Sequence, residues 1–270
     1  MVPPGESDAR AAPDVTRFFD AIAILEQFDC AEVRGVVKTL IQPLSRHETC
    51  VIGLYHRSAL TIGSLLQLRD PKHFQAIASL ARTMMELATD LALIAVFPGA
   101  VDKLLAFADV ELLKSAEELC EQAVARGVPA DETSLWARFV ASDGARIRSQ
   151  RELLWPGVRN LNHWTLLRLK ERCELLKAPF EDMYKAEYRR LSWYVHAGLS
   201  GEFISAEALG MVAGIAAQFA ADAYREILSA TVAHLQLEKA IPDIRKRLEV
   251  ARVLAFTDTP EEAAALWRSR

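Results

Sequence analysis

The stretch from about Pro71 to Phe97 limits the fold of this chain more than any other, because its apolar residues keep the period of an α-helix throughout. Large apolar side chains recur at alternating spacings of three and four residues: Ile77, Leu80, Met84, Leu87, Leu91 and Ile94. A second stripe, mostly of alanine, runs beside them: Ala78, Ala81, Met85, Ala88, Ala92 and Ala95. Because small side chains let another helix approach closely, the two stripes predict a central helix with neighbours on two sides.

The remainder of the chain repeats this helical period. No segment alternates between apolar and polar residues over a useful length, and no Asn-Gly hairpin signal occurs. The chain is therefore predicted to be all-α, a single-domain bundle of about eight to ten helices. Further helices are expected over approximately 14–30, 31–44, 47–68, 101–126, 131 or 133 to 154, 163–176, 180–199, 203–235 and 243–252, with a short one from Thr259.

The composition divides the chain into three parts. Residues 1–13 hold three prolines and a glycine among small and charged residues, which predicts a disordered leader. The bundle domain is expected over residues 14–237, and its apolar content of 51% suits a substantial core. Residues 238–270 are expected to form a C-terminal helical extension used in packing or oligomer contacts.

The N-terminus and the cysteines favour a cytoplasmic protein. The first residues lack the basic region and apolar run of a secretion signal. Cys30, Cys50, Cys120 and Cys173 have no paired spacing, so reduced thiols are expected rather than disulfides or a zinc site. The segment Ala208–Ala221 is too short to span a bilayer, and no membrane partner is predicted.

The overall charge gives no attraction to nucleic acid, because 32 basic and 36 acidic residues leave a net charge of −4. A polyanion such as RNA would need a local basic patch. Two predicted helices carry residues that favour one: Arg138, Arg146, Arg148, Arg151, Arg168, Lys170 and Arg172. The alternative is an ordinary solvated surface.

The segment Tyr188–His196 places polar groups in an otherwise apolar helical region. On an unbroken helix Tyr188, Ser192 and His196 follow one another at one-turn intervals, and Arg189 shares their face. Histidine titrates near neutrality and arginine stabilises negative charge, so these four are the candidate catalytic residues. Alternatively, they are satisfied polar groups between packed helices.

A narrow polar strip on the central helix offers a second set of candidates. Arg82, Glu86 and Asp90 lie one turn apart and are expected to face the Tyr188–His196 helix across an interior polar seam. Tyr55 and Arg190 complete this supporting network. The alternative is a solvated strip.

Common catalytic motifs are missing. The chain has no glycine-rich phosphate loop, no Gly-x-Ser-x-Gly elbow and no His-Glu-x-x-His pair. No histidine has a glutamate three residues before it, which disfavours a carboxylate-bridged metal pair. No metal or other cofactor is therefore predicted.

Three segments carry a resemblance to a known family: Leu54-Tyr55-His56-Arg57-Ser58, Leu80-Ala81-Arg82-Thr83-Met84-Met85-Glu86-Leu87 and Tyr188 to His196. They resemble the bacterial all-helical proteins grouped as domain of unknown function 5677, over roughly residues 50 to 200. The resemblance marks Arg82, Glu86, Ser192 and His196 and assigns no reaction.

The last segment is also similar to the HEPN superfamily, which includes metal-independent endoribonucleases of toxin–antitoxin and phage-defence systems. Its signature is an arginine, a short spacer and a histidine. Here six residues separate Arg189 from His196, and five separate Arg190 from it. The polar residue that usually follows the arginine is Arg190 or Leu191, a departure from the pattern. This resemblance implies a homodimer, an RNA substrate, and an antitoxin or defence-system partner.

Three functions remain open from the sequence. The first is RNA cleavage, with His196 as general acid or base and Arg189 stabilising the phosphate charge. The second is a non-catalytic interaction or sensor module with a buried Arg/Glu/Ser/His network that fixes helix register. The third is a small-ligand pocket between helices, lined by Tyr55, Glu86, Tyr188 and His196.

Overall fold

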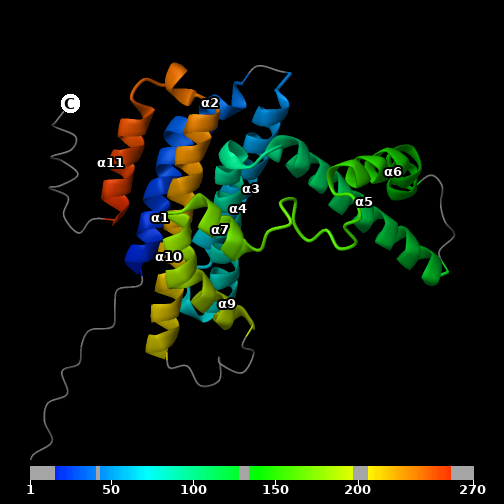
Figure 1. Ribbon diagram of the computed structural model, residues 1–270. Helices are drawn as coiled ribbons and strands as arrows, with labels where there is room; N and C mark the ends of the chain where they lie inside the picture. The colour runs from blue at the N-terminus through cyan, green and yellow to red at the C-terminus, as the bar shows by residue number, and fades with distance from the viewer. Residues whose placement is uncertain (1–15, 41–42, 128–133, 197–205, 257–270) are drawn as a thin grey trace, which may run out of the picture.

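The computed structural model describes residues 16–40, 43–127, 134–196 and 206–256, and it confirms the all-α prediction (Figure 1). No strand occurs in these ranges. The α-helices are α1 (Thr16–Phe28), α2 (Arg34–Lys38), α3 (Arg46–Gln67), α4 (Phe74–Val96), α5 (Ala100–Ala125), α6 (Leu135–Leu154), α7 (Leu169–Leu176), α8 (Phe180–Met183), α9 (Arg189–His196), α10 (Ala206–His234) and α11 (Ile244–Phe256). Two π-helical turns, Asp29–Val33 and Tyr184–Tyr188, join α1 to α2 and α8 to α9.

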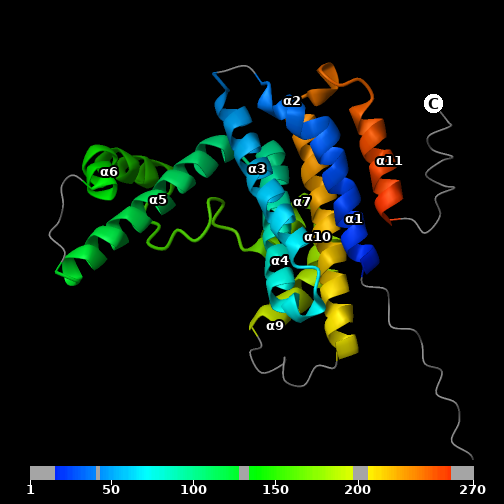
Figure 2. The same ribbon diagram turned by 180° about the vertical axis from the view of Figure 1, so that it is seen from behind.

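Helices α4 and α10 form the centre of the bundle, with α1 and α3 beside them (Figures 1 and 2). The alanine stripe predicted on the central helix is buried at Ala78, Ala81 and Ala88. Helix α10 contributes small buried residues of its own: Ala213, Ala216, Ala217, Ala220, Ala221 and Ala223. Two alanine-rich faces allow close packing of the two axes, so the prediction of a central helix is confirmed.

Helix α7 begins later than predicted. The sequence favoured a helix from His163, but residues 155–168 form an irregular loop and α7 starts at Leu169. The Thr165 hydroxyl accepts a hydrogen bond from the backbone N–H of Leu167 (3.1 Å), and Leu166 has a φ of 63°. This local turn competes with the helix, which explains why the predicted start was wrong.

The predicted helix over 180–199 is described as far as His196 and contains a change of pitch. Helix α8, the π-helical turn Tyr184–Tyr188 and α9 follow one another directly. Because a π turn adds a residue to one turn, it rotates the faces before it relative to those after it. Arg189 and His196 both fall within α9, so their relative phase is that of an α-helix. Residues 197–199 of the prediction lie outside the described ranges.

Helices α5 and α6 form an arm that projects from the bundle (Figures 1 and 2). A second hydrophobic cluster anchors the base of this arm: Leu93, Ala100, Ala106, Trp155 and Trp164. The indole N–H of Trp155 donates to the backbone carbonyl of Trp164 (3.0 Å). The arm is therefore fixed at its base, while its outer part depends on contacts between its own two helices.

Helix α11 packs on α1 and α10. Its residues Ile244, Leu248 and Ala251 belong to the main core, so the described part of the predicted extension contributes to the bundle itself. The predicted leader over 1–13 and the short helix from Thr259 lie outside the described residues. In the described ranges, no helix combines the length and the apolarity that crossing a bilayer requires.

Candidate functional site

Three of the predicted residues meet between α4 and the π-helical turn. Nη2 of Arg82 donates to the hydroxyl of Tyr188 (3.0 Å), and that hydroxyl donates to Oε1 of Glu86 (2.8 Å). The Arg82 guanidinium also lies 5.0 Å from the centre of the Tyr188 ring, a cation–π contact. The structure thus places Arg82 and Glu86 of the polar strip against the segment that carries Tyr188.

The Tyr188 hydroxyl accepts one hydrogen bond and donates its only hydrogen within this contact. The side chain is 9% exposed, and burial raises the pKa of Tyr188 to about 12; Arg82 opposes this shift and Glu86 adds to it. A phenol with this pKa stays protonated near neutrality, so it remains the donor to Glu86. Tyr188 thus joins α4 to the π-helical turn before α9, and its hydroxyl hydrogen is bonded to Glu86 and is not directed at a substrate.

The other candidates on α9 differ in environment. Arg189 is exposed, whereas Ser192 is half-buried. Arg190 is also exposed and lies 3.4 Å from the carboxylate of Glu187, apart from the Arg82–Tyr188–Glu86 contact. Arg189 and His196 are the first and last residues of α9. The backbone of His196 is described, but its side chain lies outside the described part of the structure.

Arg189 lines a cleft of about 490 Å³ between α7 and the α8–α9 segment. The lining residues are Lys170, Cys173, Glu174, Glu181, Tyr184, Lys185 and Arg189. Lys170 pairs with Glu174 (3.6 Å) and Lys185 pairs with Glu181, while Arg189 forms no ion pair with a described residue. The cleft therefore has three cations and two carboxylates, with one guanidinium available to an anion.

Tyr55 belongs to a different contact from the one predicted. It is completely buried, and its hydroxyl donates to Oδ1 of Asp29 in the first π-helical turn. Oδ2 of Asp29 accepts from Nη2 (2.7 Å) and Nε (3.1 Å) of Arg34. Burial, followed by the hydrogen bond to Asp29, raises the pKa of Tyr55. Since Tyr55 faces α1, the structure does not combine it with Glu86 and Tyr188 in the predicted ligand pocket.

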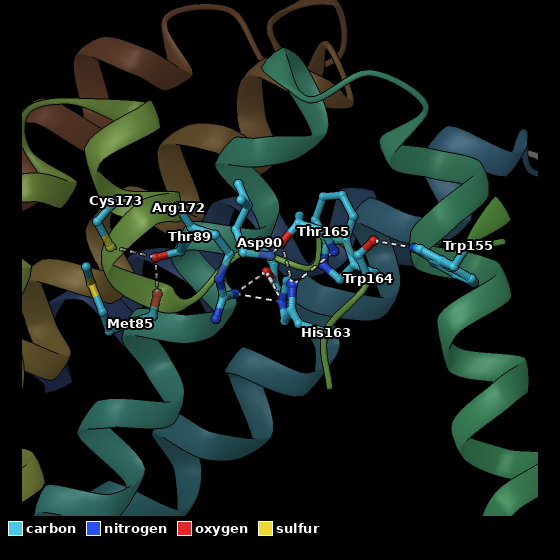
Figure 3. A network of polar contacts seen from close by, with 10 residues as sticks. Met85, Thr89, Asp90, Trp155, His163, Trp164, Thr165, Arg172 and Cys173 are labelled. Atoms are coloured by element: carbon cyan, nitrogen blue, oxygen red, sulfur yellow. Dashed lines mark hydrogen bonds and ion pairs between the residues drawn. The ribbon is translucent and has the colours of Figure 1, made fainter. Parts of the chain in front are cut away.

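Asp90 also has partners other than those expected. Figure 3 shows it between α7 and the loop before α7, where Oδ1 accepts from Nη1 of Arg172 (2.8 Å) and lies 3.0 Å from Nε2 of His163. Nδ1 of His163 lies 2.8 Å from the Thr165 hydroxyl. Arg172 is only 6% exposed. Sequence reasoning missed this cluster because it assigned Arg172 to the surface and gave His163 no role.

The predicted basic patch is not a continuous cationic surface. Arg172 is buried, and Arg151 donates to the backbone carbonyls of Val158 (2.6 Å) and Arg159 (3.0 Å). The remaining positions are divided between the arm and the bundle, and two of the arm residues pair with acids: Arg146 with Asp143, and Arg148 with Glu117. Most of these positive charges are therefore engaged within the chain.

No metal centre is formed by the described residues, since no three His, Cys, Asp or Glu side chains there are grouped as ligands. Two cysteines, Cys50 and Cys173, are buried in the described part of the chain. Burial raises the pKa of Cys50 and of Cys173 to about 11, so both thiols stay protonated near neutrality.

Comparison with known proteins places the chain by family alone. No curated protein and no solved structure matched it. One family model, described as a family of unknown function (DUF5677), matches residues 48–207, more than half of the 270 residues. The matched range includes Arg82, Glu86, Tyr188 and the whole of α9. This chain therefore belongs to the DUF5677 family of unknown function, as the resemblance in its sequence predicted.

Proposed function

We propose that this protein is a non-catalytic interaction or sensor module, in which buried polar contacts fix the register of an otherwise apolar bundle. The contact of Tyr188 with Arg82 and Glu86 carries the proposal. Apolar helix faces tolerate small displacements, whereas a buried polar group is satisfied only when its partner is in place. A tyrosine whose hydroxyl hydrogen is already donated to a neighbouring helix therefore suits a structural role better than a role in substrate chemistry.

Two further contacts extend this argument to other helix pairs. Asp29 connects the turn after α1 with Tyr55 on α3, and Asp90 connects α4 with Arg172 on α7. The three contacts lie between different elements, so together they favour one arrangement of the whole bundle. Such rigidity suits a module that presents fixed surfaces to a partner protein.

The test combines an activity assay with a stability assay. Purified full-length protein is incubated with total cellular RNA in the presence of EDTA, and the proposal expects the RNA to remain intact. Tyr188→Phe is then compared with wild type by thermal melting, and a clear loss of stability is expected. RNA cleavage that depends on α9 would overturn the non-catalytic assignment.

A second candidate function is metal-independent RNA cleavage, by a HEPN-like toxin or phage-defence effector in the cytoplasm. The exposed Arg189 in its partly cationic cleft favours it, together with the seven-residue spacing that puts Arg189 and His196 on one face of α9. In this proposal His196 acts as general base on a ribose 2′-hydroxyl or as acid on the leaving oxygen. Arg189 stabilises the charge on the phosphate, and Ser192 orients the imidazole.

The second candidate has its own matched variants. His196→Ala and Arg189→Ala should each abolish EDTA-resistant cleavage, because one removes the proton carrier and the other removes the charge stabiliser. Arg190→Ala is the control, since Arg190 pairs with Glu187 and lies outside the cleft. Cleavage that survives Arg189→Ala but not Arg190→Ala would contradict this assignment of roles.

A further inference from the structure

A pocket of about 310 Å³ lies where the arm of α5 and α6 meets the loop that leads back to α7 (Figures 1 and 2). Three parts of the chain form its walls: residues within 110–117 of α5, within 147–151 of α6 and within 159–162 of the loop. This volume is at the lower end of the range of ligand pockets, so the pocket suits a small molecule. It shares no residue with the cleft beside Arg189.

The charges around this pocket are mainly positive. Its charged lining residues are four cations and two carboxylates: Lys114, Arg148, Arg151, Arg159, Glu111 and Glu117. Arg148 pairs with Glu117, whereas Lys114 and Arg159 are exposed and form no ion pair with a described residue. Four cations against two carboxylates leave an excess of two positive charges, which favours an anionic ligand.

The loop wall of the pocket is tied to α6 and to the base of the arm. Nη2 of Arg151 donates to the backbone carbonyls of Val158 (2.6 Å) and Arg159 (3.0 Å). At the other end of the loop, the carbonyl of Trp164 accepts from the indole N–H of Trp155 (3.0 Å). Because these hydrogen bonds already fix the loop, a ligand that binds here orders little further chain.

Apolar side chains and amides complete the lining. Leu113 of α5 and Ile147 of α6 are 4% and 1% exposed and still line the pocket, so they form its floor. Asn160 and Asn162 of the loop add amide groups that both donate and accept hydrogen bonds. The pocket therefore suits a molecule that combines an anionic group with a flat or apolar part.

We propose that this pocket binds a small phosphomonoester that carries a flat or apolar group, such as a nucleoside monophosphate. A phosphomonoester has a charge of about −1.5 to −2 near neutrality, which matches the excess of two positive charges, whereas a carboxylate supplies only one. Lys114 and Arg159 bind the phosphate oxygens, and the arginine can offer two N–H groups at once. The flat group lies on Leu113 and Ile147. The inference goes beyond the proposed function and does not depend on the contacts around Tyr188.

Isothermal titration calorimetry of the full-length protein at low salt tests the proposal with four probes. Phenyl phosphate and adenosine 5′-monophosphate combine a phosphate with a flat ring, so each should bind with a Kd below about 1 mM. Inorganic phosphate lacks the ring and benzoate lacks the second charge, so each should bind about tenfold more weakly or worse. A tighter Kd for adenosine 5′-monophosphate than for phenyl phosphate would identify the ligand as a nucleotide.

Single substitutions locate the binding in this pocket. Lys114→Gln and Arg159→Gln should each weaken phenyl phosphate binding by about tenfold or more, because each removes a charged donor. Glu111→Gln should strengthen it by up to about fivefold, since it removes a negative charge that opposes the phosphate. A misfolded variant would not show such a gain. Arg138→Gln is the matched control, because Arg138 is an exposed arginine of α6 outside the pocket and the variant should bind like wild type.

Three results would overturn the proposal. The first is that neither phosphomonoester binds at millimolar concentration. The second is that Lys114→Gln and Arg159→Gln bind phenyl phosphate as wild type does, while circular dichroism shows that their helices are retained. The third is that a single-stranded RNA oligonucleotide binds and adenosine 5′-monophosphate does not, which would assign these cations to a nucleic-acid strand. RNA cleavage that depends on α9 would contradict the proposed function and leave this inference unchanged, so the two fail separately.

Discussion

The hydroxyl of Tyr188 donates a 2.8 Å hydrogen bond to Glu86, a residue 102 positions earlier in the chain. The same oxygen accepts from Arg82, one turn before Glu86 on α4. One phenol thus satisfies two groups of the central helix and fixes the segment that leads into α9. The hydroxyl of Tyr188 therefore links the central helix directly to the segment that the sequence marked as a candidate site.

Removing that hydroxyl should destabilise the fold. Tyr188→Phe keeps the ring but leaves Arg82 and Glu86 without their shared partner, so the free energy of unfolding should fall by about 1 to 3 kcal/mol. Urea denaturation followed by circular dichroism measures the change. Tyr184→Phe is the control, because the Tyr184 ring stacks on Tyr188 while its hydroxyl bonds to no described residue. Equal stability of wild type and Tyr188→Phe would contradict a structural role.

Asp90→Ala should have a larger effect, because it leaves a buried positive charge without its carboxylate. The Arg172 side chain is 7% exposed and has little access to water, so a loss of about 3 to 5 kcal/mol is expected. Replacing both residues, as Asp90→Ala with Arg172→Met, should recover part of this loss, since no charge then remains buried. If the double variant were less stable than Asp90→Ala alone, this explanation would be wrong.

The close packing of the core around α10 can be tested by enlarging a small residue. Ala217 is a completely buried residue of α10, so Ala217→Leu adds volume to a filled core and should cost about 1 to 3 kcal/mol. Met211→Leu on the same helix is the control, because Met211 is 47% exposed and should tolerate the change. The melting temperatures of both variants test this prediction. An unchanged melting temperature for Ala217→Leu would show that the core around Ala217 is loosely packed.

Acid should weaken the fold through His234. Burial, followed by the nearby His47 ring at 5.0 Å, lowers the pKa of His234 below its usual value of about 6.5. As the pH falls through about 6.5, the unfolded chain binds a proton that the folded chain does not, so the free energy of unfolding decreases until the folded pKa is reached.

His234→Gln removes this contribution, so its melting temperature should fall less between about pH 7.5 and pH 5.5 than that of wild type. His73→Gln alters an exposed histidine and should behave like wild type. An equal fall in His234→Gln and wild type would show that His234 does not contribute to acid sensitivity.

The helices of this protein were predictable because helical periodicity is a local property of the chain. The apolar seam of α4 and the alanine stripe beside it predicted a central helix, and Ile77, Ala81 and Leu91 are indeed buried there. The family was predictable for the same reason, because its marks lie in short segments such as Tyr188–His196. Where local side-chain hydrogen bonds compete, as at Thr165, the helix begins later than its pattern suggests.

The partners of the polar residues were decided by the tertiary structure. Arg82, Glu86 and Asp90 look like one strip in the sequence, but each four-residue step turns the direction by about 40° around a helix. Arg82 and Asp90 therefore point about 80° apart, one toward Tyr188 and the other toward Arg172. The helical and apolar residues could be read from the order of the amino acids, because helical periodicity is local. Which polar groups meet depends on contacts between distant segments, so it followed only from how neighbouring helices pack.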